Sequence, residues 1–174
     1  MSSPFRSISP NILTGTIALI ILILDQVSKG LAIKTMKLGD EKAVLEGFFR
    51  FVYWGNTGAA WSVFSQRNGW LAIFASAALV ALWIFRRHFE FHRTGGQVAL
   101  GLLFGGIIGN LIDRLLHNHV VDFLRFYWIR RSGEEIGFPA FNVADMAIST
   151  AVGILLLLTW QTDTRRTPSI KSPP

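Results

Sequence analysis

The stretch GLLFGGIIGNLIDR, residues 101–114, decides the fold class of this chain. It opens as an apolar run in which Gly101, Gly105 and Gly109 recur every four residues, so a helix would carry one smooth face. Small residues at that spacing let membrane helices approach each other closely. The end of the stretch is polar and carries an amide, a carboxylate and a guanidinium, on Asn110, Asp113 and Arg114. We therefore expect a tightly packed membrane helix whose polar end has a purpose beyond packing.

The composition of the whole chain supports this interpretation. Hydrophobic residues make up 51% of the 174 residues and charged residues 16%, with a mean hydropathy of +0.40. The apolar residues form four blocks, at about 12–33, 70–85, 98–114 and 143–160. Each block is near the lower end of the ~17–25 residues that span a bilayer, and none alternates as barrel strands do. We predict an all-α membrane protein with four transmembrane helices in a single domain, residues 1–162.

The chain ends lead to two further expectations. The segment 163–174 is polar and rich in proline, which predicts a disordered tail. The first block, with Arg6 ahead of it, has some features of a cleaved leader, but no A-x-A-like site follows. We expect this span to be retained.

Charge predicts the orientation in the membrane. Four spans put both termini on one side, and the base-rich link Arg86–Gln97 assigns that side to the cytoplasm. The longer loops, about 34–69 and 115–142, would share the outer face although they also carry many bases. In the first, FFRFVYWGNTGAAWSVF (48–64) alternates aromatic and β-branched residues before a turn at Gly55–Gly58. This pattern predicts a small surface sheet, with a loop or helix at the membrane surface beside it.

The net charge and the residue inventory exclude several functions. The charge of +6 fits basic loops against anionic lipid head groups better than nucleic-acid binding, because no basic stripe is interleaved with aromatics. The absence of cysteine excludes disulfides and a thiol nucleophile. No serine-hydrolase elbow or P-loop occurs. His88 and His92 are four apart, but Glu90 between them would face away, so we expect neither a metal site nor a cofactor.

Two aspartates stand at the edges of apolar stretches, Asp122 in HVVDF and Asp145 in FPAFNVADMAIS. Carboxylates near hydrocarbon are costly and are usually kept for function. If they shared one site they would not both ionise easily, which is the condition that aspartic proteases use. Each also has a plain explanation. Asp145 would lie in the first turn of a helix capped by Asn142, and Asp122 could pair with Arg125.

Other polar residues also allow two interpretations. Asp25 and Lys29 have the i, i+4 spacing of a helical ion pair, which would be either structural or substrate-orienting. Asn56 is either a turn residue or an amide that holds a substrate backbone. As a whole, intramembrane polar groups also suit a small transporter, although they cluster at one face and no inverted repeat is visible. A non-catalytic scaffold would tolerate replacement of both aspartates.

The chain resembles the bacterial lipoprotein signal peptidases, also called signal peptidase II. Five segments carry the resemblance, in the family's order and spacing: LDQVSK (24–29), NTGAAWS (56–62), GGIIGNLIDR (105–114), VVDF (120–123) and FPAFNVAD (138–145). They cover most of the chain from about residue 12 to 160. Trp61 stands where phenylalanine is usual in the family, which exchanges one aromatic residue for another.

The resemblance implies an aspartic endopeptidase of the bacterial inner membrane. It would cut prolipoproteins before the diacylglyceryl-modified cysteine, at a site near the periplasmic face, with both termini cytoplasmic. Asp122 and Asp145 would be the catalytic pair. The residues that line the site would be Asn56, Asn110, Arg114 and Asn142, and those in supporting positions would be Asp25, Lys29, Gly106, Asp113 and Ala144. We expect a monomer among membrane lipids, without metal, cofactor or nucleic acid.

Overall fold

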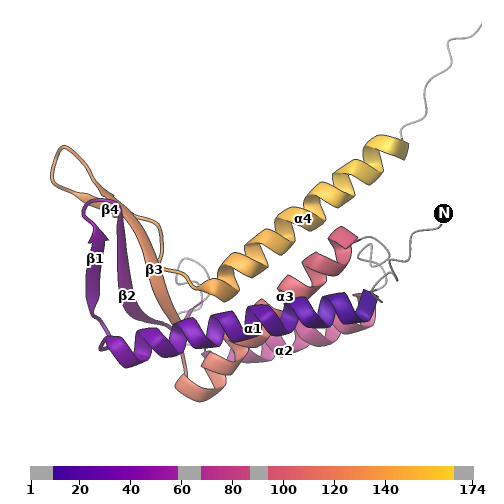
Figure 1. Cartoon of the computed structure of the whole chain (residues 1–174), viewed down its shortest axis with the longest axis horizontal. Helices are drawn as coiled ribbons and strands as arrows, with labels where there is room; N and C mark the ends of the chain where they lie inside the picture. The colour runs from indigo at the N-terminus through magenta and orange to yellow at the C-terminus, as the bar shows by residue number, and fades with distance from the viewer. Residues whose placement is uncertain (1–9, 59–67, 87–93, 167–174) are drawn as a thin grey trace, which may run out of the picture.

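The computed structural model describes residues 10–58, 68–86 and 94–166. It contains the helices α1 (Pro10–Thr35), α2 (Asn68–Phe85), α3 (Thr94–His117) and α4 (Val143–Arg166). The strands are β1 (Glu41–Leu45), β2 (Phe49–Asn56), β3 (Val120–Ile129) and β4 (Glu135–Gly137). The sheet lies at one end of the helices, and the start of α1 and the end of α4 lie at the other end (Figure 1).

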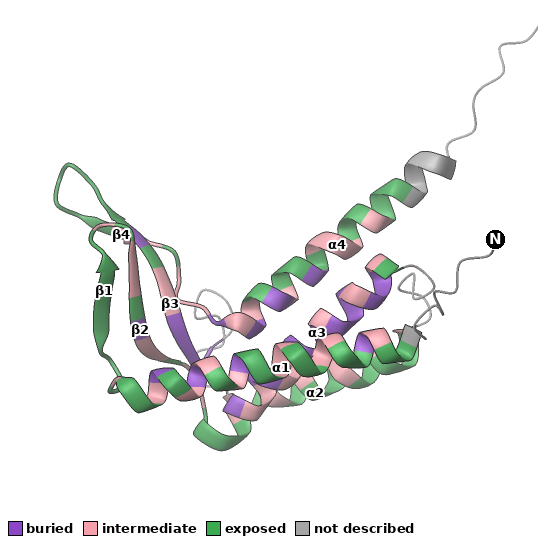
Figure 2. Cartoon of the chain, viewed as in Figure 1, coloured by how far each residue is buried: buried purple, intermediate pink, exposed green. Residues whose placement is uncertain are grey.

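All four helices are long and apolar enough to cross a membrane, so the predicted spans are confirmed. Helix α2 has no buried residue along its length (Figure 2). Large apolar side chains such as Leu31, Phe74 and Leu156 are more than half exposed on the helix surfaces. An outward face of this kind is stable only where hydrocarbon replaces water.

One boundary was predicted wrongly. Helix α4 continues to Arg166, so the part of the tail at 163–166 is helical rather than disordered. No proline interrupts the chain until Pro168, and polar side chains alone do not end a helix. The remaining tail and the pair His88 and His92 lie outside the described residues.

Helix α3 is the centre of the bundle and contacts the other three helices. Its face towards α1 is formed by Gly101, Gly105 and Gly109, which confirms the predicted close approach. A Cβ atom on Gly105 would lie 2.7 Å from the carbonyl oxygen of Ala18 in α1. On the other side of α3, a Cβ atom on Gly106 would lie 2.7 Å from the carbonyl oxygen of Ala144 in α4. The supporting positions Gly106 and Ala144 therefore form the point where α4 packs against α3.

The sheet is antiparallel throughout, in the order β1-β2-β3-β4. Strand β2 forms where the sequence predicts it but runs through Gly55, so the turn begins only after Asn56. The second long loop forms β3 and β4, and within the described residues no surface helix lies beside the sheet. Its sequence VVDFLRFYWI is β-branched and aromatic, which explains the strand. The pairing of β2 with β3 places Trp54 opposite Asp122.

Candidate active site

The start of α4 is built as a capping box. The side-chain Oδ1 of Asn142 accepts a hydrogen bond from the backbone N–H of Asp145 at 2.9 Å, and the backbone N–H of Asn142 donates to Asp145 Oδ2 at 3.3 Å. The N–H of Ala144 donates to Asp25 Oδ1 from α1 at 2.9 Å. Free N–H groups at a helix start need such partners, so the capping interpretation of Asp145 is confirmed.

Asn142 also reaches the second aspartate. Its Nδ2 donates to Asp122 Oδ1 at 2.8 Å, so one residue holds both carboxylates. The other oxygen of Asp122 accepts from Asn56 Nδ2 at 3.0 Å. Asn56 Oδ1 in turn accepts from the N–H of Gly58 at 2.9 Å, which fixes the direction of the amide. Asn56 is therefore a turn residue and an amide donor at the same time.

The alternative pairing of Asp122 with Arg125 was wrong. Residues three apart on a strand point to opposite faces of the sheet. Arg125 forms its ion pairs with Glu135 at 3.0 Å and Glu41 at 3.6 Å. Asp122 is directed to the other side, where only 3% of its surface is exposed.

This setting changes the acidity of Asp122. Burial, followed by the negative charge of Asp145, raises the pKa of Asp122 to about 7. The hydrogen bonds from Asn56 and Asn142 and the charge of Lys29 act in the opposite direction without cancelling the rise. The two aspartates thus interact electrostatically, and Asp122 holds a proton up to about neutral pH.

Asp145 is positioned by a chain of polar contacts from α3 and α1. Asn110 Nδ2 donates to Asp145 Oδ1 at 2.8 Å, and Asn110 Oδ1 accepts from Lys29 Nζ at 2.9 Å. An amide held by a cation on its oxygen must turn its NH₂ group the other way. Lys29 therefore determines which atom of Asn110 meets Asp145.

Next to this site lies a buried ion-pair cluster, formed by Asp25, Lys29 and Asp113. Lys29 Nζ is 2.8 Å from Asp25 Oδ2 and 2.9 Å from Asp113 Oδ2, and each residue is at most 2% exposed. Gln26, which the sequence analysis missed, donates to Asp25 at 3.2 Å and to Asp113 at 3.1 Å. A signal for it was present, since Gln26 is a polar residue within an apolar span. The Asp25–Lys29 ion pair therefore joins α1 to α3 through Asp113.

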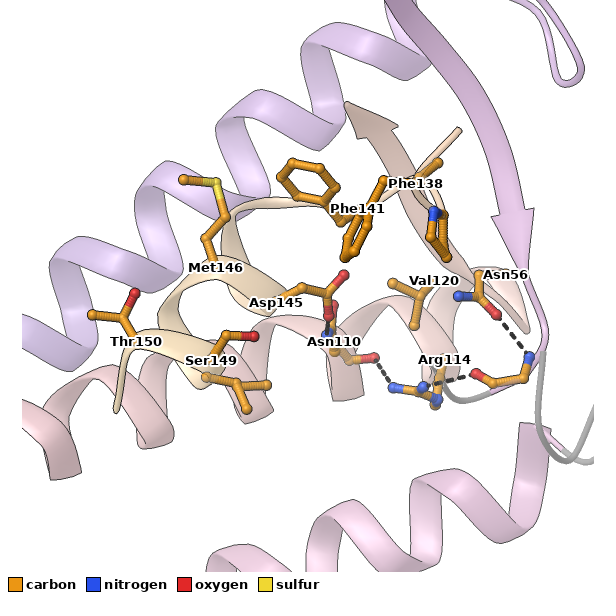
Figure 3. Close-up of a pocket in the computed structure, with 14 residues that line it drawn as sticks. Asn56, Asn110, Arg114, Val120, Phe138, Phe141, Asp145, Met146, Ser149 and Thr150 are labelled. Carbon is orange, nitrogen blue, oxygen red and sulfur yellow. Dashed lines mark hydrogen bonds between the residues drawn. The ribbon is translucent and has the colours of Figure 1, made fainter. Parts of the chain in front are cut away.

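A cavity of about 570 Å³ opens beside the two aspartates. Its polar lining includes Asp145, Asn110, Asn56 and Arg114, and its apolar lining includes Phe138, Phe141 and Met146 (Figure 3). Asp122 is not among the described lining residues and meets the cavity wall through Asn56.

Arg114 is held at the edge of this cavity by weak contacts. Its guanidinium donates to the carbonyl oxygens of Asn110 at 3.3 Å and Gly58 at 3.4 Å. The buried Nε has no acceptor within the described residues. No cluster of three or more His, Cys, Asp or Glu side chains in the described part of the chain is arranged to hold a metal ion.

These features match a known family. Residues 17–161 match the family model described as signal peptidase (SPase) II. This chain belongs to the signal peptidase II family. The resemblance drawn from the five sequence segments is thereby confirmed, and membership of a peptidase family decides against the transporter and scaffold alternatives.

Similar proteins and a solved structure agree with the assignment to the signal peptidase II family. The lipoprotein signal peptidase of Syntrophotalea carbinolica is 40% identical over 148 residues, which cover 83% of this chain and 89% of the relative. That of Symbiobacterium thermophilum is 37% identical over 145 residues, covering 83% and 92%. A structure described as a bacterial membrane enzyme, solved by the in meso method at 2.3 Å resolution, superposes with a TM-score of 0.73 at 33% identity over 92% of this chain and 94% of the other.

Proposed function

We propose that this signal peptidase II is an aspartic endopeptidase in which Asp122 and Asp145 are the catalytic pair. Its substrate would be a prolipoprotein whose cysteine carries diacylglycerol, cut at the bond before that cysteine. The observation that carries the proposal is the contact of Asn142 with both carboxylates, at 2.8 Å to Asp122 and 3.3 Å to Asp145. Two carboxyl groups bound to one residue, with the pKa of one raised by burial and by the charge of the other, are suited to sharing a proton.

The surroundings divide the work between the two aspartates. Asp145 lies in the first turn of α4 and accepts hydrogen bonds from Asn110 and from the N–H of Asn142, all of which favour its ionised form. Asp122, with its pKa near 7, carries the proton. Asp145 is therefore the general base and Asp122 the general acid in this proposal.

The reaction follows from that assignment. Asp145 takes a proton from a water molecule as the water oxygen bonds to the scissile carbonyl carbon, and Asp122 gives its proton to the carbonyl oxygen. The resulting diol collapses when Asp145 passes its proton to the leaving amine and the C–N bond breaks. Asp122 then recovers a proton from the diol hydroxyl, so the pair ends in its starting state.

The polar residues around the pair would act without exchanging protons. Arg114 and Asn56 line the cavity with N–H donors, which suits orientation of a peptide backbone and stabilisation of developing negative charge. Phe138, Phe141 and Met146 offer an apolar wall to a lipid-bearing substrate. Lys29 and Asp25 would hold Asp145 in place, the first through Asn110 and the second through the N–H of Ala144.

We place the site at the periplasmic face of the inner membrane, with both termini in the cytoplasm. The sheet lies at the end of the bundle away from the start of α1 and the end of α4 (Figure 1), and the cavity is lined there by Asn56 at the end of β2 and Asp145 in the first turn of α4. The end of α2 and the start of α3, which the base-rich sequence Arg86–Gln97 joins, lie at the same end of the bundle as the start of α1, in agreement with the positive-inside rule for a cytoplasmic link. All proposed site residues come from one chain, which supports a monomer that functions within membrane lipid.

The test is cleavage of a purified prolipoprotein, with and without diacylglycerol on its cysteine. Wild-type enzyme should release a product that begins at the lipid-modified cysteine, as read by mass spectrometry, and should leave the unmodified precursor intact. Asp122→Asn and Asp145→Asn should be inactive although folded. Near-normal cleavage by either variant would remove that residue from the mechanism, and an inactive wild type would overturn the substrate assignment.

A further inference from the structure

A second cavity, of about 460 Å³, lies between α1, α2 and α3. Both α1 and α2 pack against α3 but make no extensive contact with each other, which leaves a groove between them. Its α1 wall begins at Asn11, in the first turn of that helix, and its α2 wall ends at Arg86. The groove is therefore at the end of the bundle opposite the sheet, away from the proposed catalytic pair.

The groove changes from polar to apolar along its length. Asn11 and Arg86 stand at its outer end, whereas the deeper walls include Ala18, Phe104 and Ile108. Ala18 lies two turns into α1 and Ile108 four turns into α3, towards the middle of the helices. A charged outer end above an apolar channel matches an amphiphile whose head group stays at the membrane surface.

Arg86 is suited to an anionic head group. Its guanidinium carbon is 4.1 Å from the centre of the Trp83 ring, and one N–H donates to the carbonyl oxygen of Trp83. These contacts neutralise the C-terminal end of α2 and hold the side chain at the groove. An arginine has five N–H donors. Among the described residues only one of those of Arg86 has an acceptor, so the others can bind an anion.

We propose that this groove binds an anionic phospholipid, with the phosphate at Arg86 and one acyl chain along Ala18 and Phe104. Basic pockets between transmembrane helices attract anionic lipids, and a volume of several hundred Å³ is typical of a small-molecule site. This binding site does not depend on the catalytic assignment of Asp122 and Asp145, since none of its lining residues belongs to that site.

Two glycines of α1 provide a matched test. A Cβ atom on Gly15, which lines the groove, would meet nothing within 4 Å, so this position accepts a side chain and Gly15→Leu should fill the groove. Gly30 on the same helix is equally open but lies outside the groove, so Gly30→Leu is the control. Both variants and Arg86→Gln are purified in detergent, and their thermal unfolding is compared with that of the wild type.

Native mass spectrometry then measures retention of phosphatidylglycerol and phosphatidylcholine added in equal amounts. Wild type and Gly30→Leu should retain phosphatidylglycerol in preference. Arg86→Gln should lower its apparent affinity about fivefold, and Gly15→Leu should remove binding of both lipids. Equal retention of the two lipids by the wild type, or undiminished phosphatidylglycerol on folded Gly15→Leu, would overturn the proposal. Undiminished preference in Arg86→Gln would equally overturn the head-group contact.

Discussion

Two groups of carboxylates meet near the start of α4, and they differ in how their charge is balanced. In the buried ion-pair cluster, Lys29 lies within 2.9 Å of both Asp25 and Asp113. Asp122 and Asp145 instead receive hydrogen bonds from asparagines, and within the described residues no lysine or arginine forms an ion pair with either. A carboxylate with a fixed cation keeps its charge, whereas one held by amides remains able to gain and lose a proton. The first arrangement suits rigidity and the second suits chemistry.

The largest expected difference between the two groups comes from neutralising the proposed catalytic pair, Asp122 and Asp145. Asp122→Asn and Asp145→Asn should each lower prolipoprotein cleavage by about 10³-fold or more, because one proton carrier is lost. At pH 5, where Asp122 is protonated, the free energy of unfolding should change by less than about 1 kcal/mol, since an amide has the same shape and still accepts one hydrogen bond. Initial cleavage rates and unfolding curves in detergent measure the two effects. A large loss of stability would instead assign the residue to the framework.

The opposite result is expected for the cluster. Lys29→Met leaves Asp25 and Asp113 buried without a cation, which should lower the free energy of unfolding by about 3–5 kcal/mol. As a control, the triple variant that adds Asp25→Asn and Asp113→Asn should recover most of this loss, because no unpaired charge remains. Unfolding curves of the two variants provide the comparison. If Lys29→Met unfolds like the wild type, the cluster does not stabilise the bundle.

The pH dependence of stability separates the groups further. Asp122 in the folded protein has a pKa of about 7, above the ~3.9 of an unfolded chain, so folding takes up a proton between those values. Stability should therefore fall as pH rises from about 4 to about 7, by roughly 4 kcal/mol, and then level off. Asp122→Asn should remove this fall, as unfolding at pH 5 and pH 8 would reveal. Parallel pH dependence in the variant and the wild type would contradict the assignment.

Catalysis should show the same titration. Because Asp122 holds the shared proton in the proposed mechanism, cleavage should decline as the pH rises through about 7. The two aspartates titrate as a unit, so the apparent pKa of this decline belongs to the pair rather than to one residue. A rate that stays constant from pH 6 to about pH 9 would place the required proton elsewhere.

The smallest effect is expected at an exposed ion pair of the sheet. Arg130 and Glu134 lie 3.2 Å apart, with side chains 59% and 63% exposed. Glu134→Gln should change the free energy of unfolding by less than about 0.5 kcal/mol, because water screens the pair. The distance resembles those in the buried cluster, so the contrast with Lys29→Met isolates the contribution of burial. An effect above about 1 kcal/mol would show that separation, rather than burial, governs these pairs.

Much of this fold follows from local rules. Apolar length predicts the four spans, and the glycines of α3 predict the close approach of another helix, which the structure shows to be α1. The segment FPAFNVAD predicts a helix start, since Pro139 and Asn142 precede a helix with an acid in its first turn. The capping and catalytic interpretations of Asp145 looked like rivals in sequence, but they are compatible, because the carboxylate that caps α4 also lines the cavity.

What escaped prediction depends on contacts between distant segments. The partner of Asp122 is decided by strand register, which places Trp54 opposite it and turns Arg125 to the far face. Gln26 gains its importance only when α3 brings Asp113 alongside α1. No periodicity within a single segment contains this information.

The cap at the start of α4 has a consequence for how the protein is made. A chain is synthesised from its N-terminus, so Asp145 is the last of the proposed site residues to reach the membrane. Its neighbour Ala144 then donates to Asp25 from α1, the first helix of the described chain, which closes the bundle. A nascent chain that lacks α4 has Asp122 and its donor Asn56 but not the second carboxylate, Asp145. Proteolytic competence would thus begin only when insertion is finished, which protects neighbouring membrane proteins from a half-built peptidase.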